Sequence, residues 1–161
     1  MTDPFRPVGD GARATAVTLM QLPHAALATL TGQGAPFVTR IALARDPGGV
    51  PLTLVSRLAL HTEALLTGAS CSLLLGEPGD KGDPLTHPRL TVQARPAPVL
   101  RDDPGFDDLA QHYISQRPKA QLYIGFTDFL LVRLMPETAF LNGGFGKAYR
   151  LTPGDLGLAS P

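Results

Sequence analysis

The sequence has almost no cysteine, no tryptophan and no long apolar run. Its 161 residues include one cysteine, Cys71. A single cysteine cannot form an intrachain disulfide or a dithiol redox pair, and the lack of disulfides suits a cytosolic protein. No stretch approaches the roughly 20 apolar residues that a membrane-spanning helix needs. The N-terminus has no basic segment followed by a long apolar one, so no signal peptide is expected. We therefore expect a cytoplasmic protein with no membrane partner.

The chain also lacks an excess of charge of either sign. Lysine and arginine number 14 together, and so do aspartate and glutamate. No broad electrostatic field would attract nucleic acid or anionic lipid. A nucleic-acid partner is therefore not expected, and any anion site must be local. The histidines have no cysteine or carboxylate at metal-ligand spacing, which argues against a structural zinc site.

The apolar content, 43%, suits a single domain with a genuine core. Apolar runs are separated by turns that hold most of the 17 glycines and 16 prolines. The connections are mostly too short for parallel crossovers, so the pattern predicts antiparallel strands in a closed or partly closed barrel with helices outside. Strands are predicted at 25–30, 36–45, 50–55, 70–75, 89–95, 129–134 and 139–141, and helices at 11–22, 59–67 and 104–116.

We divide the chain into an N-terminal arm (1–10), a barrel domain (11–152) and a flexible tail (153–161). Cys71 lies in an apolar run and is expected to be buried and inert. Arg101 is expected on a surface loop, where its replacement should have no effect.

A group of polar residues at a strand-to-helix junction is the main candidate binding site. Backbone N–H groups at a helix start have no partner within the helix, and the helix dipole is positive there. Hydroxyls and a guanidinium in the same place suit a phosphate or another anion. The alternative is that the serine caps the helix while the arginine and histidine face solvent. The candidates are Arg40 on the neighbouring strand and Ser56, Arg57, His61 and Thr62 at the junction.

A second candidate is the glycine-rich segment 143–147, in which Gly144, Phe145 and Lys147 are the residues of interest. Glycines allow a ligand to approach the backbone closely, and the lysine can reach an anionic group. The spacing matches neither a Walker loop nor the dinucleotide-binding fingerprint. The alternative is a glycine-rich bend between two strands.

Several segments together resemble a known family. They read PFVTRIAL, LVSRLALHTEAL, CSLLL, GDPLTHPRLTVQAR, AQLYIGFTDFLLVRL and NGGFGKAYRL. From about residue 12 to 151 the chain is similar to the pyridoxamine 5'-phosphate oxidase-like split-barrel family, and within it to the branch of the heme-utilization protein HugZ. The resemblance implies a mainly β (α+β) fold, a six-stranded antiparallel split β-barrel with flanking helices. It also implies a homodimer with a ligand cleft at the interface that commonly holds FMN.

By this resemblance Arg40 takes the place of a phosphate-binding arginine, and Ser56–Thr62 that of a phosphate-binding turn. His61 falls near the position of a lysine in the oxidases, and Gly144–Lys147 would approach the same cleft. The oxidases bind their pyridoxal substrate through a C-terminal segment with a tryptophan, so the lack of tryptophan argues against that reaction. In HugZ the axial heme histidine lies near the C-terminus, whereas no histidine follows His112 here.

Three functions are consistent with these features. The first is a flavin-dependent oxidoreductase of unknown substrate, in which FMN performs the redox step and the protein holds its phosphate. The second is a heme-binding or heme-degrading protein, in which Arg40, Arg57 or Lys147 meets the propionates. The third is a non-catalytic ligand-binding or regulatory module that kept the barrel. No residue is placed as an acid–base catalyst, so catalytic residues stay unassigned.

Overall fold

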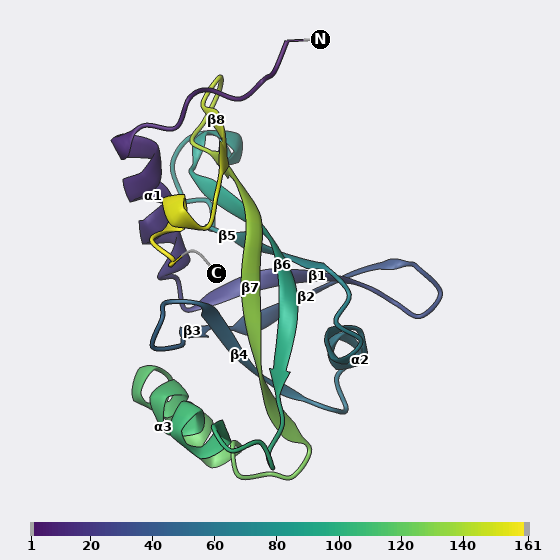
Figure 1. Ribbon diagram of the computed structural model, residues 1–161. Helices are drawn as coiled ribbons and strands as arrows, with labels where there is room; N and C mark the ends of the chain where they lie inside the picture. Colours follow the sequence, from purple (N-terminus) through teal and green to yellow (C-terminus); the bar gives the residue numbers. More distant parts are fainter. Residues whose placement is uncertain (1, 160–161) are drawn as a thin grey trace.

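Short strands with alternating buried and exposed residues form an antiparallel sheet that curls into a half-open barrel (Figure 1). This computed structural model describes residues 2–159. The strands are β1 (His24–Leu30), β2 (Pro36–Ala42), β3 (Ala44–Arg45), β4 (Pro51–Ser56), β5 (Cys71–Leu75), β6 (Arg89–Val99), β7 (Phe129–Asn142) and β8 (Ala148–Leu151). The helices are α1 (Asp10–Met20), α2 (Leu60–Leu66) and α3 (Phe106–Gln116), with 3-10 turns η1 (Pro84–Thr86), η2 (Pro118–Leu122) and η3 (Gly154–Leu156).

One stretch of chain, β2 followed by β3, meets both edges of the sheet. The strand order is β2-β1-β5-β6-β7-β4-β3, with β8 beside β7. β2 pairs with β1 over its whole length, and after Leu43 the chain continues as β3 and pairs with β4. The Thr53 hydroxyl adds one link by donating to the Ala42 carbonyl at 2.8 Å. Beyond that link the described residues show no pairing between β2 and β4, so the barrel is split there.

The short edge strand β3 is covered rather than left open. The amide side chain of Gln116, at the end of α3, accepts from the Arg45 N–H at 2.9 Å and donates to the Arg45 carbonyl at 2.7 Å. These two bonds satisfy the backbone of an edge strand that otherwise offers itself to another chain. They also stabilise the end of the barrel at which β3 pairs with β4, whereas at the other end β2 and β4 are separated.

The predicted split-barrel fold is confirmed, with longer strands and more of them than expected. The sequence predicts two separate strands on either side of Met135–Glu137, but in the structure β7 continues through this segment as one strand. The β6–β7 register shifts so that Glu137 has no opposite residue, and this bulge accommodates Pro136. β6 extends past Arg95 through two prolines, Pro96 and Pro98, that lie beyond the end of β5. Strand β8 was not predicted.

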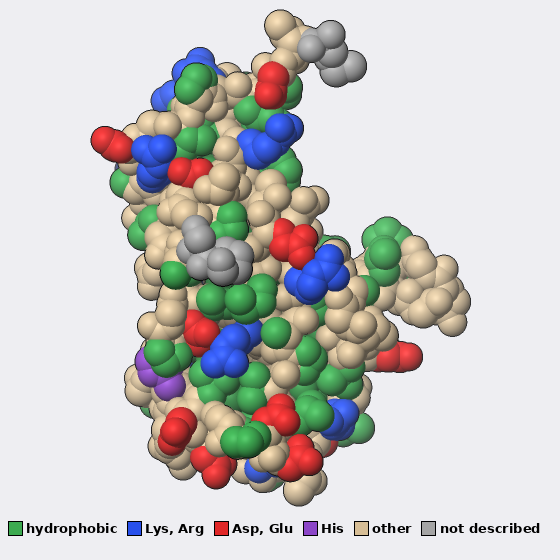
Figure 2. Space-filling model, viewed as in Figure 1, with side chains coloured by type: hydrophobic (Ala, Val, Ile, Leu, Met, Phe, Trp, Pro, Cys, Tyr) green, Lys and Arg blue, Asp and Glu red, His purple; other side chains and the backbone are tan. Residues whose placement is uncertain are grey.

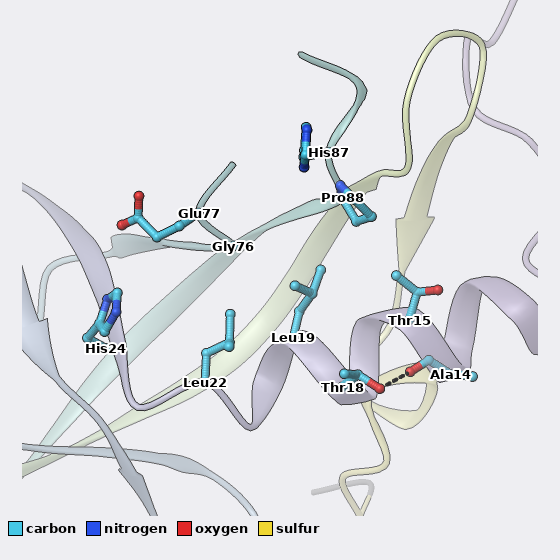
Figure 3. A pocket seen from close by; sticks show the side chains of 10 residues that line it. All are labelled: Ala14, Thr15, Thr18, Leu19, Leu22, His24, Gly76, Glu77, His87 and Pro88. Carbon is cyan, nitrogen blue, oxygen red and sulfur yellow. Dashed lines mark hydrogen bonds between the residues drawn. The ribbon is translucent and has the colours of Figure 1, made fainter. Parts of the chain in front are cut away.

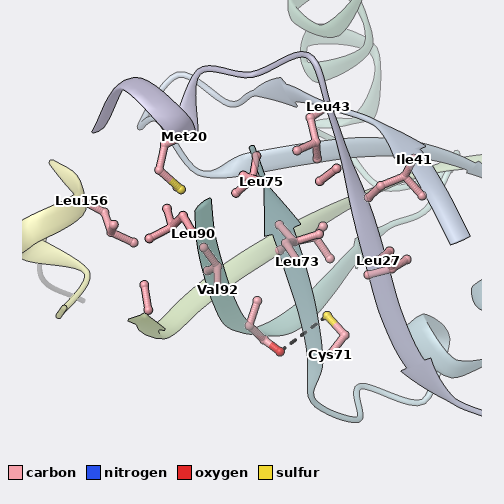
Figure 4. Packing of buried hydrophobic residues seen from close by; sticks show 14 of the residues in the cluster. Met20, Leu27, Ile41, Leu43, Cys71, Leu73, Leu75, Leu90, Val92 and Leu156 are labelled. Carbon is pink, nitrogen blue, oxygen red and sulfur yellow. Dashed lines mark hydrogen bonds between the residues drawn. The ribbon is translucent and has the colours of Figure 1, made fainter. Parts of the chain in front are cut away.

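The core has two parts, one inside the barrel and one beneath α3. Inside the barrel, leucines of β1, β5 and β6 meet residues of α1 and η3 (Figure 4). Outside it, Leu52 and Leu131 contact α3 through Phe106, Leu109 and Tyr113. Cys71 is 5% exposed, and burial raises the pKa of its thiol to about 11. Its predicted burial is confirmed, and its inertness stays a prediction.

Both termini contact the barrel more closely than expected. In the predicted arm, the Arg6 N–H donates to the Ala148 carbonyl at 2.9 Å, and the Phe5 ring lies 5.6 Å from that of Phe140. In the predicted flexible tail, Leu156 is 4% exposed and part of the core. Met1 of that arm and residues 160–161 of that tail lie outside the described residues. None of the helices in the described part of the chain is long and apolar enough to cross a membrane.

Arg101 lies in the turn between β6 and α3, as expected, but its side chain is partly buried and engaged. Its guanidinium donates to three backbone carbonyls, those of Ile124 at 2.8 Å, Gly125 at 3.3 Å and Phe129 at 3.4 Å. It also lies 5.1 Å from the centre of the Phe106 ring. Arg101 therefore ties the segment after η2 to the start of α3, and it cannot serve as an inert control.

We expect Arg101→Ala to lower the free energy of unfolding by about 1–3 kcal/mol, because it leaves several partly buried carbonyls without a donor. Urea unfolding followed by circular dichroism measures this loss. Lys81→Ala, which removes an exposed cation from the loop before β6, is the matched control and should change nothing. Equal stability of Arg101→Ala and the wild type would contradict the assignment.

Candidate functional site

The split between β2 and β4 is a cleft with mostly apolar walls. Its volume is about 340 Å³. β2 supplies one wall and β4 the other, while α2 and the segment after η2 close its ends. The lining residues are Arg40, Ile41, Ala42, Leu54, Val55, Ser56, Ala59, His61, Tyr123 and Phe129. Three of the predicted site residues, Arg40, Ser56 and His61, therefore meet in one cleft although β2 and β4 are not paired there.

His61 bridges the cleft from α2 to β2. Its Nδ1 lies 2.9 Å from the hydroxyl oxygen of Thr39. Burial lowers the pKa of the imidazole, so the neutral ring is favoured near pH 7. His61 is therefore not simply wetted by solvent, as the alternative interpretation of the sequence supposed.

Ser56 is engaged by a carboxylate that the sequence did not connect with it. Its hydroxyl donates to Asp128 Oδ2 at 2.5 Å and accepts from the Leu58 N–H at 3.1 Å. The Arg57 N–H donates to the Asp128 carbonyl at 2.8 Å. Asp128 therefore fixes the turn between β4 and α2, and it places a negative charge where a phosphate was expected.

The remaining groups of the turn are also mostly used within the protein. Thr62 is fully buried, and its hydroxyl donates to the Ser56 carbonyl at 2.5 Å. The N–H groups of Ala59 and Thr62 donate to the carbonyls of Ser56 and Ala59. Few hydrogen-bond donors of this turn are therefore left to hold a phosphate. The helix dipole adds little, because α2 has only 7 residues.

Arg40 lines the cleft, whereas Arg57 does not line it but follows the lining residue Ser56 in the chain. Arg40 and Arg57 are exposed, and neither takes part in the ion pairs found among residues 2–159. Arg57 contributes to the turn through its backbone, which leaves its side chain for a ligand. Both cations can meet carboxylates or phosphates.

Sequence reasoning missed two aromatic residues that line the cleft and the carboxylate that bonds to Ser56. Tyr123 and Phe129 form an aromatic wall, with ring centres 5.2 Å apart. The segment AQLYIGFTDF contains both of them and Asp128, yet no local spacing links it to Ser56, which lies 72 positions earlier. The pairing of β4 with β7 brings them together, because Ser56 lies opposite Phe129.

The glycine-rich segment lies at the other end of β7. It is a bend between β7 and β8, closed by the Gly143 N–H donating to the Lys147 carbonyl at 2.8 Å. Gly144, with φ of 118°, adopts a backbone conformation that favours glycine. β7 has 14 residues, so at about 3.3 Å per residue this bend is about 40 Å from Phe129. Phe145 is 75% exposed, and within one chain neither it nor Lys147 meets the cleft.

A larger hollow of about 610 Å³ lies between α1 and the loop after β5 (Figure 3). His24, Glu77 and His87 line it together with apolar residues of α1. Both ring nitrogens of His87 are used, since Nδ1 accepts from the Gly79 N–H at 3.0 Å and Nε2 lies 2.7 Å from the Lys81 carbonyl. No cation lines this hollow, so it does not suit an anionic ligand.

Large apolar side chains are exposed around the cleft. Figure 2 shows hydrophobic side chains over α2 and the lower end of β7. Exposed fractions from 58% to 86% are found for Val38 on β2, for Leu58 and Leu60 near the start of α2, and for Leu122 and Phe126 near Tyr123 in the chain. Apolar side chains that gather on one surface mark a place where a ligand or partner can dock.

No family model matches the chain. The chloroplastic heme oxygenase HOZ of Arabidopsis thaliana is 31% identical over 121 residues, which are 70% of this chain and 36% of HOZ. Heme oxygenase HutZ of Vibrio cholerae is 30% identical over 136 residues, which are 81% of this chain and 74% of HutZ. The chain belongs to the pyridoxamine 5'-phosphate oxidase-like split-barrel family, in the HugZ and HutZ branch.

A solved structure agrees with this membership. The structure of a heme binding protein from Mycobacterium smegmatis has a TM-score of 0.77 at 25% identity, over 93% of this chain and 61% of that one. The predicted family is therefore confirmed. The chain spans about a third of HOZ and about three quarters of HutZ, so the activity of either whole protein is not transferred by the alignment.

We expect Asp128→Ala to destabilise this split-barrel protein by about 1–3 kcal/mol, because Ser56 loses a charged acceptor in a partly buried turn. Ser56→Ala should cost a similar amount, and the double variant should cost less than the two losses combined. Urea unfolding of all three variants measures the coupling. Asp80→Ala, in an exposed loop, is the control. Additive losses would mean that Asp128 and Ser56 do not act together.

Proposed function

We propose that this protein binds heme in the cleft between β2 and β4. The observation that carries the proposal is the combination of an apolar, aromatic-walled cleft with Arg40 in its lining and the exposed Arg57 next to Ser56 in the chain. Neither arginine takes part in an ion pair among residues 2–159. A porphyrin is a broad apolar plane with two propionate groups at one edge. Its plane suits Ile41, Leu54 and Phe129, and its propionates suit Arg40 and Arg57.

FMN, the ligand first expected, is supported less well by the same contacts. Its phosphate needs several donors, whereas the hydroxyls of Ser56 and Thr62 are already engaged. The carboxylate of Asp128 beside Ser56 would repel a phosphate dianion in that position. Propionates avoid this conflict, because they need only the two exposed arginines.

The names of the two relatives point to breakdown of the bound heme as the activity. When bound, heme supplies the redox-active iron for that chemistry, with dioxygen and an electron donor taken from solution. The protein's own residues would hold the porphyrin, neutralise its propionates and exclude bulk water from one face.

A second copy of the chain completes this proposed site. The cleft is too small and open to enclose a porphyrin, and exposed apolar side chains surround it. A homodimer that covers them would bury their surface and can bring the distant Gly144–Lys147 bend of the partner to the cleft. Phe145 would then offer a stacking face and Lys147 a further cation.

Titration with hemin and with FMN tests the proposed ligand. We expect a saturable Soret band with hemin and no binding of FMN. Arg40→Ala and Arg57→Ala should each weaken hemin binding by about 1 kcal/mol, roughly fivefold, because exposed charge pairs are weak. Lys81→Ala should bind hemin as the wild type does.

The same samples show whether bound heme is degraded. With ascorbate in air, bound hemin should lose its Soret band faster than free hemin. Saturable FMN binding without hemin binding would overturn the proposed function. Hemin binding without ascorbate-dependent loss would restrict it to heme binding.

Sedimentation velocity tests the second copy. We expect a dimer at micromolar concentration, and we expect Leu60→Asp to dissociate it by placing a charge in an apolar interface. Leu85→Asp, an exposed leucine of the loop before β6, is the control and should leave the dimer intact. A monomeric wild type would contradict the proposal that two copies of the chain share the cleft.

A further inference from the structure

We propose that His61 is the protein ligand of the heme iron and that Thr39 is its positioning residue. This inference rests on the proposed heme site and names the contact that the cleft makes with the metal. His61 comes from α2 and belongs to the lining of the cleft. The assignment therefore gives this chain an iron ligand of its own, within the cleft.

The position of His61 sets it apart from the other histidines, all of which lie in the described residues. His61 lines the cleft whose walls and arginines suit a porphyrin. His24 and His87 line the other hollow, where Glu77 would repel propionates. His112 lies on α3, and the cleft lining does not include it. Imidazole is a common ligand of iron in proteins.

The hydrogen bond to Thr39 gives His61 the arrangement that metal-binding histidines share. Such histidines use one ring nitrogen for the metal and donate the other N–H to an oxygen acceptor, which fixes the ring and its tautomer. The Thr39 hydroxyl oxygen lies 2.9 Å from Nδ1. Nε2 makes no hydrogen bond within residues 2–159 and carries the lone pair when Nδ1 holds the proton.

The ring of His61 is partly buried and belongs to the same cleft lining as Arg40. A metal binds a ring nitrogen that carries no proton. The single contact with Thr39 spans from α2 to β2, and it holds the ring at the cleft without occupying its second nitrogen.

A pair of porphyrins separates iron ligation from support of the cleft. Hemin contains iron, whereas metal-free protoporphyrin IX has the same plane and propionates but no metal to ligate. We expect His61→Ala to weaken hemin binding by more than about tenfold, since even the loss of a group that orients a ligand costs about 10–100-fold in metal affinity. It should leave the affinity for metal-free protoporphyrin IX unchanged. His24→Ala is the matched control and should change neither affinity.

Spectra of the ferric complex test both residues without any measurement of activity. The electron paramagnetic resonance signal should lose its imidazole-ligated character in His61→Ala and regain it when imidazole is added. Thr39→Val should keep hemin bound but alter that signal, and Thr39→Ser, which restores the hydroxyl, should recover it.

The outcomes distinguish the two proposals. If the wild type binds neither porphyrin, the proposed heme function fails. If the wild type binds hemin and His61→Ala matches it in affinity and spectrum, His61 is not the ligand although the heme site stands. If His61→Ala loses both porphyrins equally, His61 supports the cleft and does not ligate iron, which also overturns the inference.

Discussion

The structure depends on one stretch of chain, β2 followed by β3, that forms both edge strands of the same sheet. β2 is committed to β1 along its whole length, so its continuation β3 supplies only two residues to β4. The barrel is closed at that end by those pairs and by the Thr53–Ala42 bond, and it cannot close at the other. Unpaired strand backbones are then left facing each other, and the side chains that line this gap form the cleft. The proposed binding site is therefore a consequence of the sheet topology.

Once the gap exists, its polar groups divide into two kinds. The first kind stabilises the turn that leads into α2 through hydrogen bonds within the protein, and it consists of Ser56, Thr62 and Asp128. The side chains of Arg40 and Arg57 are exposed and take part in no ion pair among residues 2–159. A ligand with two carboxylates and a large apolar body needs only the exposed arginine side chains, whereas a phosphate needs the hydroxyl donors of the turn. This division of donors favours heme over FMN, in agreement with the names of the two relatives.

Most of the fold could be predicted from the sequence, because alternation of apolar residues and turn signals are local. The errors arose where proline is tolerated for a reason that local patterns do not contain, as at the Pro136 bulge and beyond β5 at Pro96. The site was predicted less completely. Local spacing gave Ser56 and His61, and an expected pairing of neighbouring strands together with the family resemblance gave Arg40. The contacts of Ser56 with Asp128 and of His61 with Thr39, however, join residues 72 and 22 positions apart. The glycine-rich bend lies a full strand away, which spacing could not show.

The location of the porphyrin is the central claim, and paramagnetic broadening tests it most directly. Ferric heme broadens the amide signals of nearby residues in the spectrum of the ¹⁵N-labelled protein. The account predicts that hemin broadens the amides of β2, β4 and the start of α2, including Arg40, Ser56 and His61, and spares those of α1 and the loop after β5. Broadening centred on His24, Glu77 and His87 instead would place the heme in the other hollow and contradict the account.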